Sequence, residues 1–141
     1  MRKARKFRII LDTNLWISFL ISKRLKKIDT LFHQDNIILI FSEELLEEFI
    51  TVAQRPKFNK YFSDKDLENI LNLFDVFGEL IKVTSVVEVC RDEKDNFLLA
   101  LAKDGNVDFL ITGDDDLLSI NIFENTTILN YKKFELEVQT E

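Results

Sequence analysis

Acidic side chains directly follow two of the apolar segments expected to form strands. Asp12 comes after residues 7–11, and a run of three Asp residues that begins at Asp114 comes after residues 109–112. If the two strands are neighbours in a parallel sheet, their carboxyl ends share one edge, where such sheets bind ligands. Carboxylates held close together repel one another, and a divalent cation removes that cost. Hard oxygen ligands of this kind suit Mg²⁺ or Mn²⁺.

Each of these carboxylates also has a purely structural interpretation. Asp12 could cap the helix expected after it, and the run from Asp114 could be a solvated turn at the start of a short helix. Asp95 stands in the first turn of a helix expected over residues 92–103, and a helical wheel places it on the inward side. A buried carboxylate there needs a partner. Alternatively, Asp92 caps the helix and Asp95 supports it against the dipole.

The helix expected after residue 42 carries four Glu residues, of which two border its apolar stripe. Glu48 lies at one edge of that stripe and Glu43 at the other, so helical periodicity does not choose between them. Four Glu residues on one helix more often form a solvated face. The residues alone therefore assign no functional carboxylate to this helix.

Short apolar runs alternate with helical patterns along the chain. Ser42 and Ser63 are expected N-caps, and Gly78 and Gly105 are expected to follow helix ends. The pattern predicts strands at residues 7–11, 37–41, 80–84, 109–112 and 126–129. It predicts helices at residues 14–27, 42–54, 63–77 and 92–103, with a short one before the last strand. This alternation indicates an α/β protein with a parallel sheet covered on both faces, and 141 residues fit a single domain over 1–141.

Composition excludes several classes of site. Cys90 is the only Cys and cannot form an internal disulfide, and His33 is the only His, which argues against a His-ligated metal. The net charge of −6 is a weak objection to nucleic-acid binding, since a bound cation would supply positive charge at a phosphate. No apolar run approaches the roughly 20 residues that span a bilayer, and residues 1–11 lack the features of a signal peptide. We therefore expect a cytoplasmic protein with no membrane contact.

Four short motifs, in this order, resemble the PIN-domain family. They are LDTN at residues 11–14, SxxLxxE at 42–48 running into RPKF at 55–58, DNxL at 95–98 and TGDDDL at 112–117. Each motif alone is weak, but all of them at these separations make a strong signal that extends from Phe7 to about Leu129. Within the family, the chain is most similar to toxin ribonucleases of bacterial and archaeal toxin–antitoxin systems.

This resemblance implies a three-layer α/β/α sandwich with a central, mostly parallel five-stranded sheet. It also implies a metal-dependent endoribonuclease that uses Mg²⁺ or Mn²⁺ to hydrolyse single-stranded or structured RNA. The family's catalytic, metal-binding quartet falls on Asp12, Glu48, Asp95 and Asp114. Asp116 matches a further metal-binding position, and Asn14 and Thr112 match polar residues that orient the carboxylates. A toxin of this kind has a small antitoxin protein as its partner.

Basic residues indicate where RNA could lie. Arg55, Lys57 and Lys60 are interleaved with Phe58 and Tyr61, an arrangement that can hold phosphates and stack bases of single-stranded RNA. A second basic group lies within residues 23–27. Either group could instead be an ordinary solvated face, and the apolar side chains within residues 58–62 could serve a homodimer.

Two other classes of protein compete with the ribonuclease interpretation. A phosphotransfer enzyme of the haloacid dehalogenase kind would need a second Asp where this chain has Asn14. A non-catalytic PIN-like domain that binds RNA or a protein is the stronger rival. Degenerate members of the family typically lose one or more carboxylates, however, and this chain retains the full acidic set.

Overall fold

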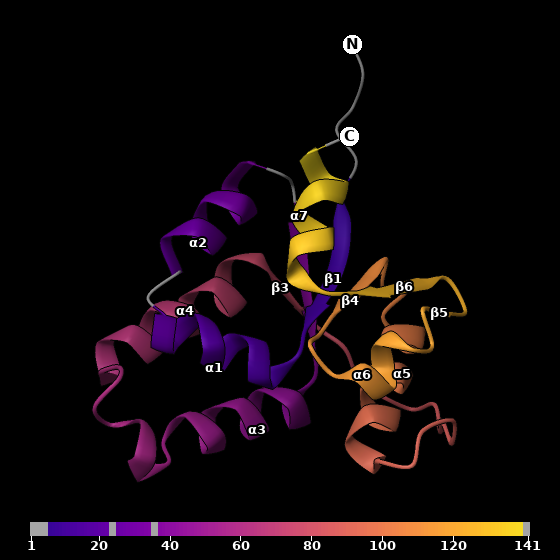
Figure 1. The fold of residues 1–141 in the computed structure, drawn as a ribbon, viewed down its shortest axis with the longest axis horizontal. Coiled ribbons are helices and arrows are strands. Elements are labelled where there is room, and N and C mark those ends of the chain that lie inside the picture. Colours follow the sequence, from indigo (N-terminus) through magenta and orange to yellow (C-terminus); the bar gives the residue numbers. More distant parts are fainter. Residues whose placement is uncertain (1–5, 23–24, 35–36, 140–141) are drawn as a thin grey trace.

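Six strands form one mixed sheet with the order β3-β2-β1-β4-β6-β5 (Figure 1). The computed structural model describes residues 6–22, 25–34 and 37–139. Neighbouring strands run parallel except β5, which pairs antiparallel with β6. The strands are β1 (Phe7–Leu11), β2 (Ile37–Phe41), β3 (Gly78–Leu80), β4 (Phe109–Ile111), β5 (Ile122–Phe123) and β6 (Thr126–Leu129). The strand order therefore reverses direction between β1 and β4, the two central strands.

The central strands are buried on both faces. In β1, Ile9 and Leu11 belong to one hydrophobic core and Ile10 belongs to the other. In β4, Leu110 and Ile111 are divided between the two cores in the same way. Strands that are covered on both sides favour apolar residues at nearly every position. β4 is accordingly a continuous apolar run, and β1 is interrupted only by Arg8, whose side chain donates to the Gly105 carbonyl and to Glu79.

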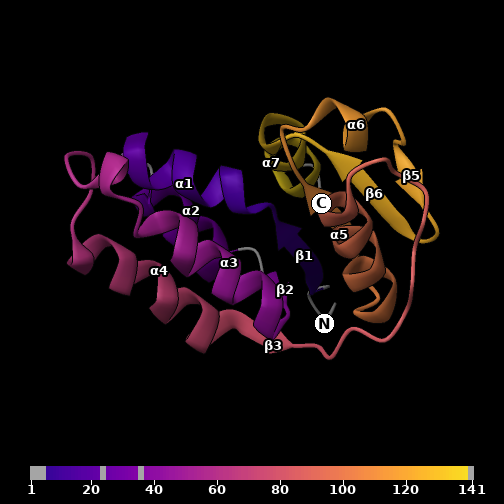
Figure 2. The same ribbon diagram turned by 90° about the horizontal axis from the view of Figure 1, so that it is seen from below.

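Helices cover the two faces and complete a three-layer α/β/α fold (Figure 2). On one face, Trp16 of α1 packs against the rings of Phe32, Phe49 and Phe74 from three other helices. On the other face, α5 and α6 bury their leucines. The helices are α1 (Thr13–Ser22), α2 (Leu25–Gln34), α3 (Glu43–Ala53), α4 (Asp64–Phe77), α5 (Glu93–Asp104), α6 (Asp115–Leu118) and α7 (Tyr131–Gln139). The predicted fold class is confirmed.

The sheet differs from the prediction at its two edges. It has six strands rather than five. The additional strand, β5, has only two residues, of which Ile122 is exposed, and this is too short a pattern to predict a strand from the sequence. At the other edge, the predicted strand at 80–84 is wrong beyond its first residue, because β3 spans Gly78–Leu80 and residues 81–84 are not in a strand. Gly78 is extended, with φ −89°, and directly joins α4 to β3. A Cβ at Gly78 would collide with the carbonyl oxygen of Phe74 and the ring of Phe41, so glycine is required by close packing and not by a left-handed turn.

The helices differ from the prediction in two places. The single helix predicted at residues 14–27 is two helices, α1 and α2, and α7 was not predicted. Lys23 and Arg24 of the second basic group, and residues 1–5 of the basic N-terminus, lie outside the described residues. Ser42 and Ser63 cap α3 and α4 as predicted. None of the helices in the described ranges is long and apolar enough to cross a membrane.

Candidate functional site

Asp12 and the residues after β4 are joined directly because β1 and β4 are neighbours. The register pairs Leu11 with Ile111, and the Asp12 amide donates a hydrogen bond to the carbonyl oxygen of Ile111 at 3.0 Å. The Thr112 hydroxyl donates to Asp12 Oδ2 at 2.8 Å and accepts from the Asp114 amide at 3.0 Å. The reversal of strand order thus brings the carboxylates of both strand ends to one place, as the sequence predicted conditionally.

The helix-capping roles of these carboxylates are real and coexist with the cluster. An oxygen of Asp12 also accepts from the Asn14 amide in the first turn of α1, at 3.4 Å. Asp114 is the N-cap of α6 and accepts from the Asp116 amide at 2.9 Å. Asp92 caps α5, as the structural interpretation expected. Capping fixes the backbone of each turn and keeps the carboxylates of Asp12 and Asp114 at the edge of the sheet.

Asp95 is the most deeply placed carboxylate of the group. Its side chain is only 5% exposed, and its Oδ2 atom has no hydrogen-bond partner among the described residues. Oxygen atoms of Asp95, Asp114 and Asp116 all lie within 4.8 Å of one another. Burial, followed by the adjacent carboxyl of Asp114, raises the pKa of Asp95 to about 7. Asp95 is therefore more than a surface residue that supports a helix dipole.

A cleft of about 450 Å³ opens over these residues. Among the residues that line it are the four predicted carboxylates Asp12, Glu48, Asp95 and Asp114, three further carboxylates, Glu44, Asp92 and Glu93, and Asn14. Glu48 reaches it from α3, whose first turn is fixed by the buried Ser42 hydroxyl accepting from the Leu45 amide at 3.0 Å. Glu43, the other candidate on this helix, does not line the cleft. Thr112 does not line the cleft but donates a hydrogen bond to the Asp12 carboxylate. Asp116 lies beside Asp95 and Asp114 without bordering the cleft.

The electrostatics of the cleft favour a bound cation. Burial raises the pKa of Asp12 against the hydrogen bond from Thr112, which lowers it, and the charge of Asp114 raises it further. A buried carboxylate with an unpartnered oxygen is costly unless an opposite charge compensates it. Several carboxylate oxygens around one open space are ligands of the type that Mg²⁺ and Mn²⁺ prefer. The residues present thus fit a hard divalent cation.

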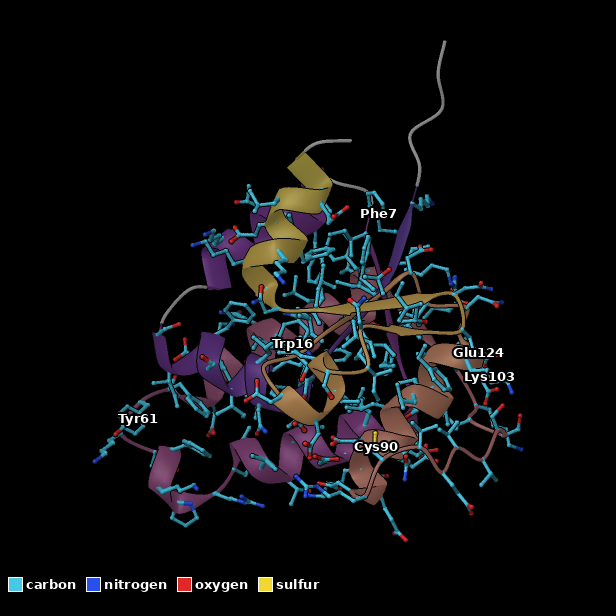
Figure 3. All side chains as sticks on the ribbon, turned by 45° about the vertical axis from the view of Figure 1, so that its right-hand side comes forward. Phe7, Trp16, Tyr61, Cys90, Lys103 and Glu124 are labelled. Atoms are coloured by element: carbon cyan, nitrogen blue, oxygen red, sulfur yellow. The ribbon has the colours of Figure 1, made fainter. Side chains whose placement is uncertain are left out.

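The three basic residues predicted to contact substrate are not all at the cleft. Arg55 lines the cleft from the turn that follows α3. Lys57 and Lys60 are exposed, and their Nζ atoms lie over the rings of Phe58 and Tyr61, at 5.1 Å and 5.2 Å from the ring centroids. Tyr61 is at the periphery of the molecule, far from the buried Trp16 (Figure 3). These two Lys residues could contact only a substrate that extends out of the cleft.

Sequence reasoning missed several residues of the site. Glu44 and Lys94 line the cleft, and Thr13 contributes a buried hydroxyl oxygen with no hydrogen-bond partner among the described residues. Arg91 forms an ion pair with Asp116. Glu44 lies one helical turn before Glu48, on the same face of the helix, and Lys94 directly precedes Asp95. Their spacing from these two candidates is the signal in the sequence that points to them. The partner of Arg91 depends on tertiary structure, and no spacing in the sequence predicts it.

The fold and site identify the class of protein. Residues 8–116 match the PIN domain family, and this chain belongs to that family. The match includes every candidate carboxylate from Asp12 to Asp116. The uncharacterized protein MJ1680 of Methanocaldococcus jannaschii is 30% identical over 138 residues, which make up 96% of this chain and 87% of that protein. The predicted family is confirmed.

Two crystal structures share the fold. PAE2754 from Pyrobaculum aerophilum matches with a TM-score of 0.60 and 12% identity, over 96% of this chain and 91% of that one. VapBC2 from Rickettsia felis, bound to a DNA fragment from its promoter, matches with a TM-score of 0.53 and 16% identity, over 88% of this chain and 98% of that one. PIN domains are generally nucleases and typically use divalent metal ions.

Proposed function

We propose that this chain is a metal-dependent endoribonuclease that hydrolyses phosphodiester bonds of single-stranded or structured RNA. One observation carries the proposal: carboxylates from four segments of the chain, namely the end of β1, α3, the start of α5 and the turn after β4, line a single open cleft. A domain that only bound RNA would have no use for such a set, because carboxylates repel phosphates. The family, whose members are generally nucleases, supports the same activity.

The residues of the chain divide the work of such a site. Asp12, Glu48, Asp95 and Asp114 would hold Mg²⁺ or Mn²⁺, and Asp116, at the outer edge of the group, would be a ligand of any second cation. When bound, the cation would make a water molecule nucleophilic and stabilise the leaving oxygen. Thr112 fixes the orientation of Asp12 by its hydrogen bond, and Asn14 lines the cleft beside it. Arg55, in the turn after α3, lines the cleft and would hold a phosphate next to the cleaved bond.

A cleavage assay on the purified chain tests this activity. Labelled single-stranded RNA is incubated with the protein in Mg²⁺, in Mn²⁺ and in EDTA. We expect cleavage with either cation, none in EDTA, and a loss of about 100-fold or more in Asp12→Asn. Asp75→Asn is the matched control, because Asp75 is an exposed carboxylate on α4 that does not line the cleft. Cleavage by Asp12→Asn at the wild-type rate would contradict the mechanism.

The non-catalytic alternative makes a different prediction in the same experiment. A PIN domain that only binds RNA or a protein partner would cleave no RNA in any condition, yet would retain RNA in a filter-binding assay without added cation. The acidic cleft argues against this outcome, since RNA would then approach unneutralised carboxylates.

We also propose that the chain is the toxin of a toxin–antitoxin pair that acts in the cytoplasm. The shared fold with VapBC2 supports this at the level of architecture. The expected partner is a small antitoxin protein encoded by an adjacent gene. Expression of the chain alone is expected to slow growth, and coexpression of the adjacent gene is expected to restore it. Growth unaffected by the chain alone would remove the toxin role and leave the nuclease proposal standing.

A homodimer is the remaining proposed assembly. Phe58 and Phe62 stack on one another at 5.9 Å, and Tyr61 beside them is 41% exposed. This small aromatic group, at residues 58–62, would be covered in a dimer that uses it. Light scattering on the wild-type chain and on Tyr61→Ser measures the mass directly, and a monomeric wild type contradicts the assembly.

A further inference from the structure

Arg91 pairs with the outermost carboxylate of the acidic cluster. Its Nε and Nη2 atoms donate to the two carboxylate oxygens of Asp116, each at 3.3 Å. An oxygen of Asp116 also lies within 4.8 Å of oxygens of Asp95 and Asp114. The guanidinium therefore stands beside a carboxylate that is close enough to the others to share a cation with them.

The inner and outer carboxylates have different surroundings. Asp12, Asp95 and Asp114 line the cleft, whereas Asp116 lies outside it with a side chain that is 44% exposed. Asp95 Oδ2 is buried and has no partner within the described part of the chain, and it is therefore open to an external cation. At Asp116, the chain itself supplies the opposite charge. The cluster is thus divided into an inner part that needs a cation and an outer part that already has one.

The backbone around Arg91 holds the guanidinium near Asp116. The side-chain oxygen of Asn96 accepts hydrogen bonds from the amides of Val89 and Cys90, at 3.1 Å and 2.7 Å, and its nitrogen donates to the Cys90 carbonyl at 2.8 Å. On the other side of Arg91, Asp92 caps α5. Arg91 itself is 85% exposed. Fixing the backbone on both sides sets the position from which this exposed side chain reaches Asp116.

We propose that Arg91 acts as a built-in cation at Asp116, so that the cleft binds one divalent cation rather than two. The inference rests on the proposed metal-dependent function. Paired metal ions in hydrolases lie roughly 4 Å apart and share carboxylates, and Asp116 is the carboxylate that a second ion would need. A guanidinium keeps its charge at every physiological pH and binds a carboxylate through two donors. Arg91 therefore sets the number of ions without contacting the inner position.

Counting bound ions tests this role without reference to activity. The whole chain is titrated with Mn²⁺, and the free ion is measured by its electron paramagnetic resonance signal. We expect about one tightly bound Mn²⁺ per chain in the wild type and about two in Arg91→Gln. Arg91→Lys keeps the charge and should still bind about one. The double variant Arg91→Gln/Asp116→Asn should return to about one, because the ligand of the second ion is gone.

The outcomes separate this inference from the proposed function. A wild-type chain that binds no Mn²⁺ contradicts the metal-dependent function, and the role of Arg91 with it. A wild-type chain that binds two ions, or an Arg91→Gln variant that binds one ion with unchanged affinity, contradicts only the role of Arg91. Thermal melting of each variant in EDTA shows that the folds are comparable; the exposed position of Arg91 makes a large loss of stability unexpected.

Discussion

Thr112 connects the two strand ends that form the site, through one hydroxyl group. It donates to Asp12 and accepts from the Asp114 amide, and it is itself fully buried. A group that makes both contacts fixes the Asp12 carboxylate relative to the turn that carries Asp114, and replacing residues that orient metal ligands in this way commonly changes metal affinity by about 10–100-fold. We therefore expect Thr112→Val to weaken Mn²⁺ binding by about that factor, measured by calorimetric titration.

A matched control separates this effect from a general loss of stability. Thr126 is also buried, and its hydroxyl donates to the Val107 carbonyl at 2.7 Å, at the opposite end of the sheet. Thr112→Val and Thr126→Val should each lower the free energy of unfolding by roughly 1–3 kcal/mol. Only the first should weaken Mn²⁺ binding, and Thr112→Ser should restore it. Equal affinities in both Val variants would show that Thr112 has no special role.

Asp95 makes the stability of the metal-free chain depend on pH. Its folded-state pKa is raised to about 7, so the folded chain keeps a proton that the unfolded chain has released. This proton contributes fully to the free energy of unfolding below about pH 4, and its contribution is lost as the pH rises toward about 7. In EDTA, Asp95→Asn should therefore gain roughly 2 kcal/mol relative to the wild type between about pH 5 and about pH 8. Urea denaturation measures the gain, with Asp75→Asn as the control. If the free energy of unfolding changes with pH in the same way in the wild type and in Asp95→Asn, the raised pKa of Asp95 is contradicted.

At the scale of elements, α3 brings Glu48 to the cleft, and the N-cap of α3 fixes where this helix begins. Ser42→Ala removes the bond to the Leu45 amide inside the protein and should cost about 1 kcal/mol of stability. Ser63→Ala removes the corresponding cap of α4, which does not reach the cleft, at a similar cost. Denaturation and Mn²⁺ titration of both variants should show similar losses of stability, but weaker Mn²⁺ binding only for Ser42→Ala. If Ser63→Ala weakens Mn²⁺ binding equally, the position of α3 is not what matters.

Elements were predictable from sequence where burial imposes a strong pattern. β1, β2, β4 and β6 lie within a residue of their predicted positions because both of their faces are largely buried, which favours apolar residues at most positions. Arg8 in β1 and the two Thr residues that begin β6 are the exceptions. The edge strand β5 has no such requirement, and its pairing with β6 is a tertiary feature. The break between α1 and α2 was missed because the apolar spacing continues from Leu20 to Ile28, both of which are buried.

The same distinction applies to the residues of the site. Asp12 and Asp114 could be placed together from the order of elements, since the ends of neighbouring strands meet at one edge. The helical periodicity of residues 92–103 predicts Asp95 on the inward side of α5, and Asp95 is buried there. Helical periodicity could not choose Glu48 over Glu43, because that choice depends on the angle at which α3 crosses the sheet edge. The pairing of Arg91 with Asp116 likewise depends on how the segment before α5 runs.

At the scale of the whole molecule, the acidic cleft adds a local repulsion to a chain with a net charge of −6. A divalent cation that binds only the folded chain should stabilise it by about 2.7 kcal/mol at 100 times its dissociation constant. For a chain of this length, that gain corresponds to a rise of roughly 8 °C in the melting temperature. We expect this rise with Mn²⁺ or Mg²⁺ in differential scanning calorimetry, and its reversal by EDTA.

Two controls, KCl and the variant Asp12→Asn, show whether the rise in melting temperature comes from a cation bound in the cleft. KCl at equal ionic strength screens the net charge of the whole surface. K⁺ carries a single charge and should bind the carboxylates of the cleft much more weakly than Mn²⁺, so KCl should raise the melting temperature much less. Asp12→Asn should lose most of the Mn²⁺-dependent rise while keeping the small response to KCl, because it removes one ligand and leaves the general surface charge almost unchanged. If Mn²⁺ and KCl act equally on the wild type, the cations are only screening charge, and the carboxylates of the cleft do not form a metal site.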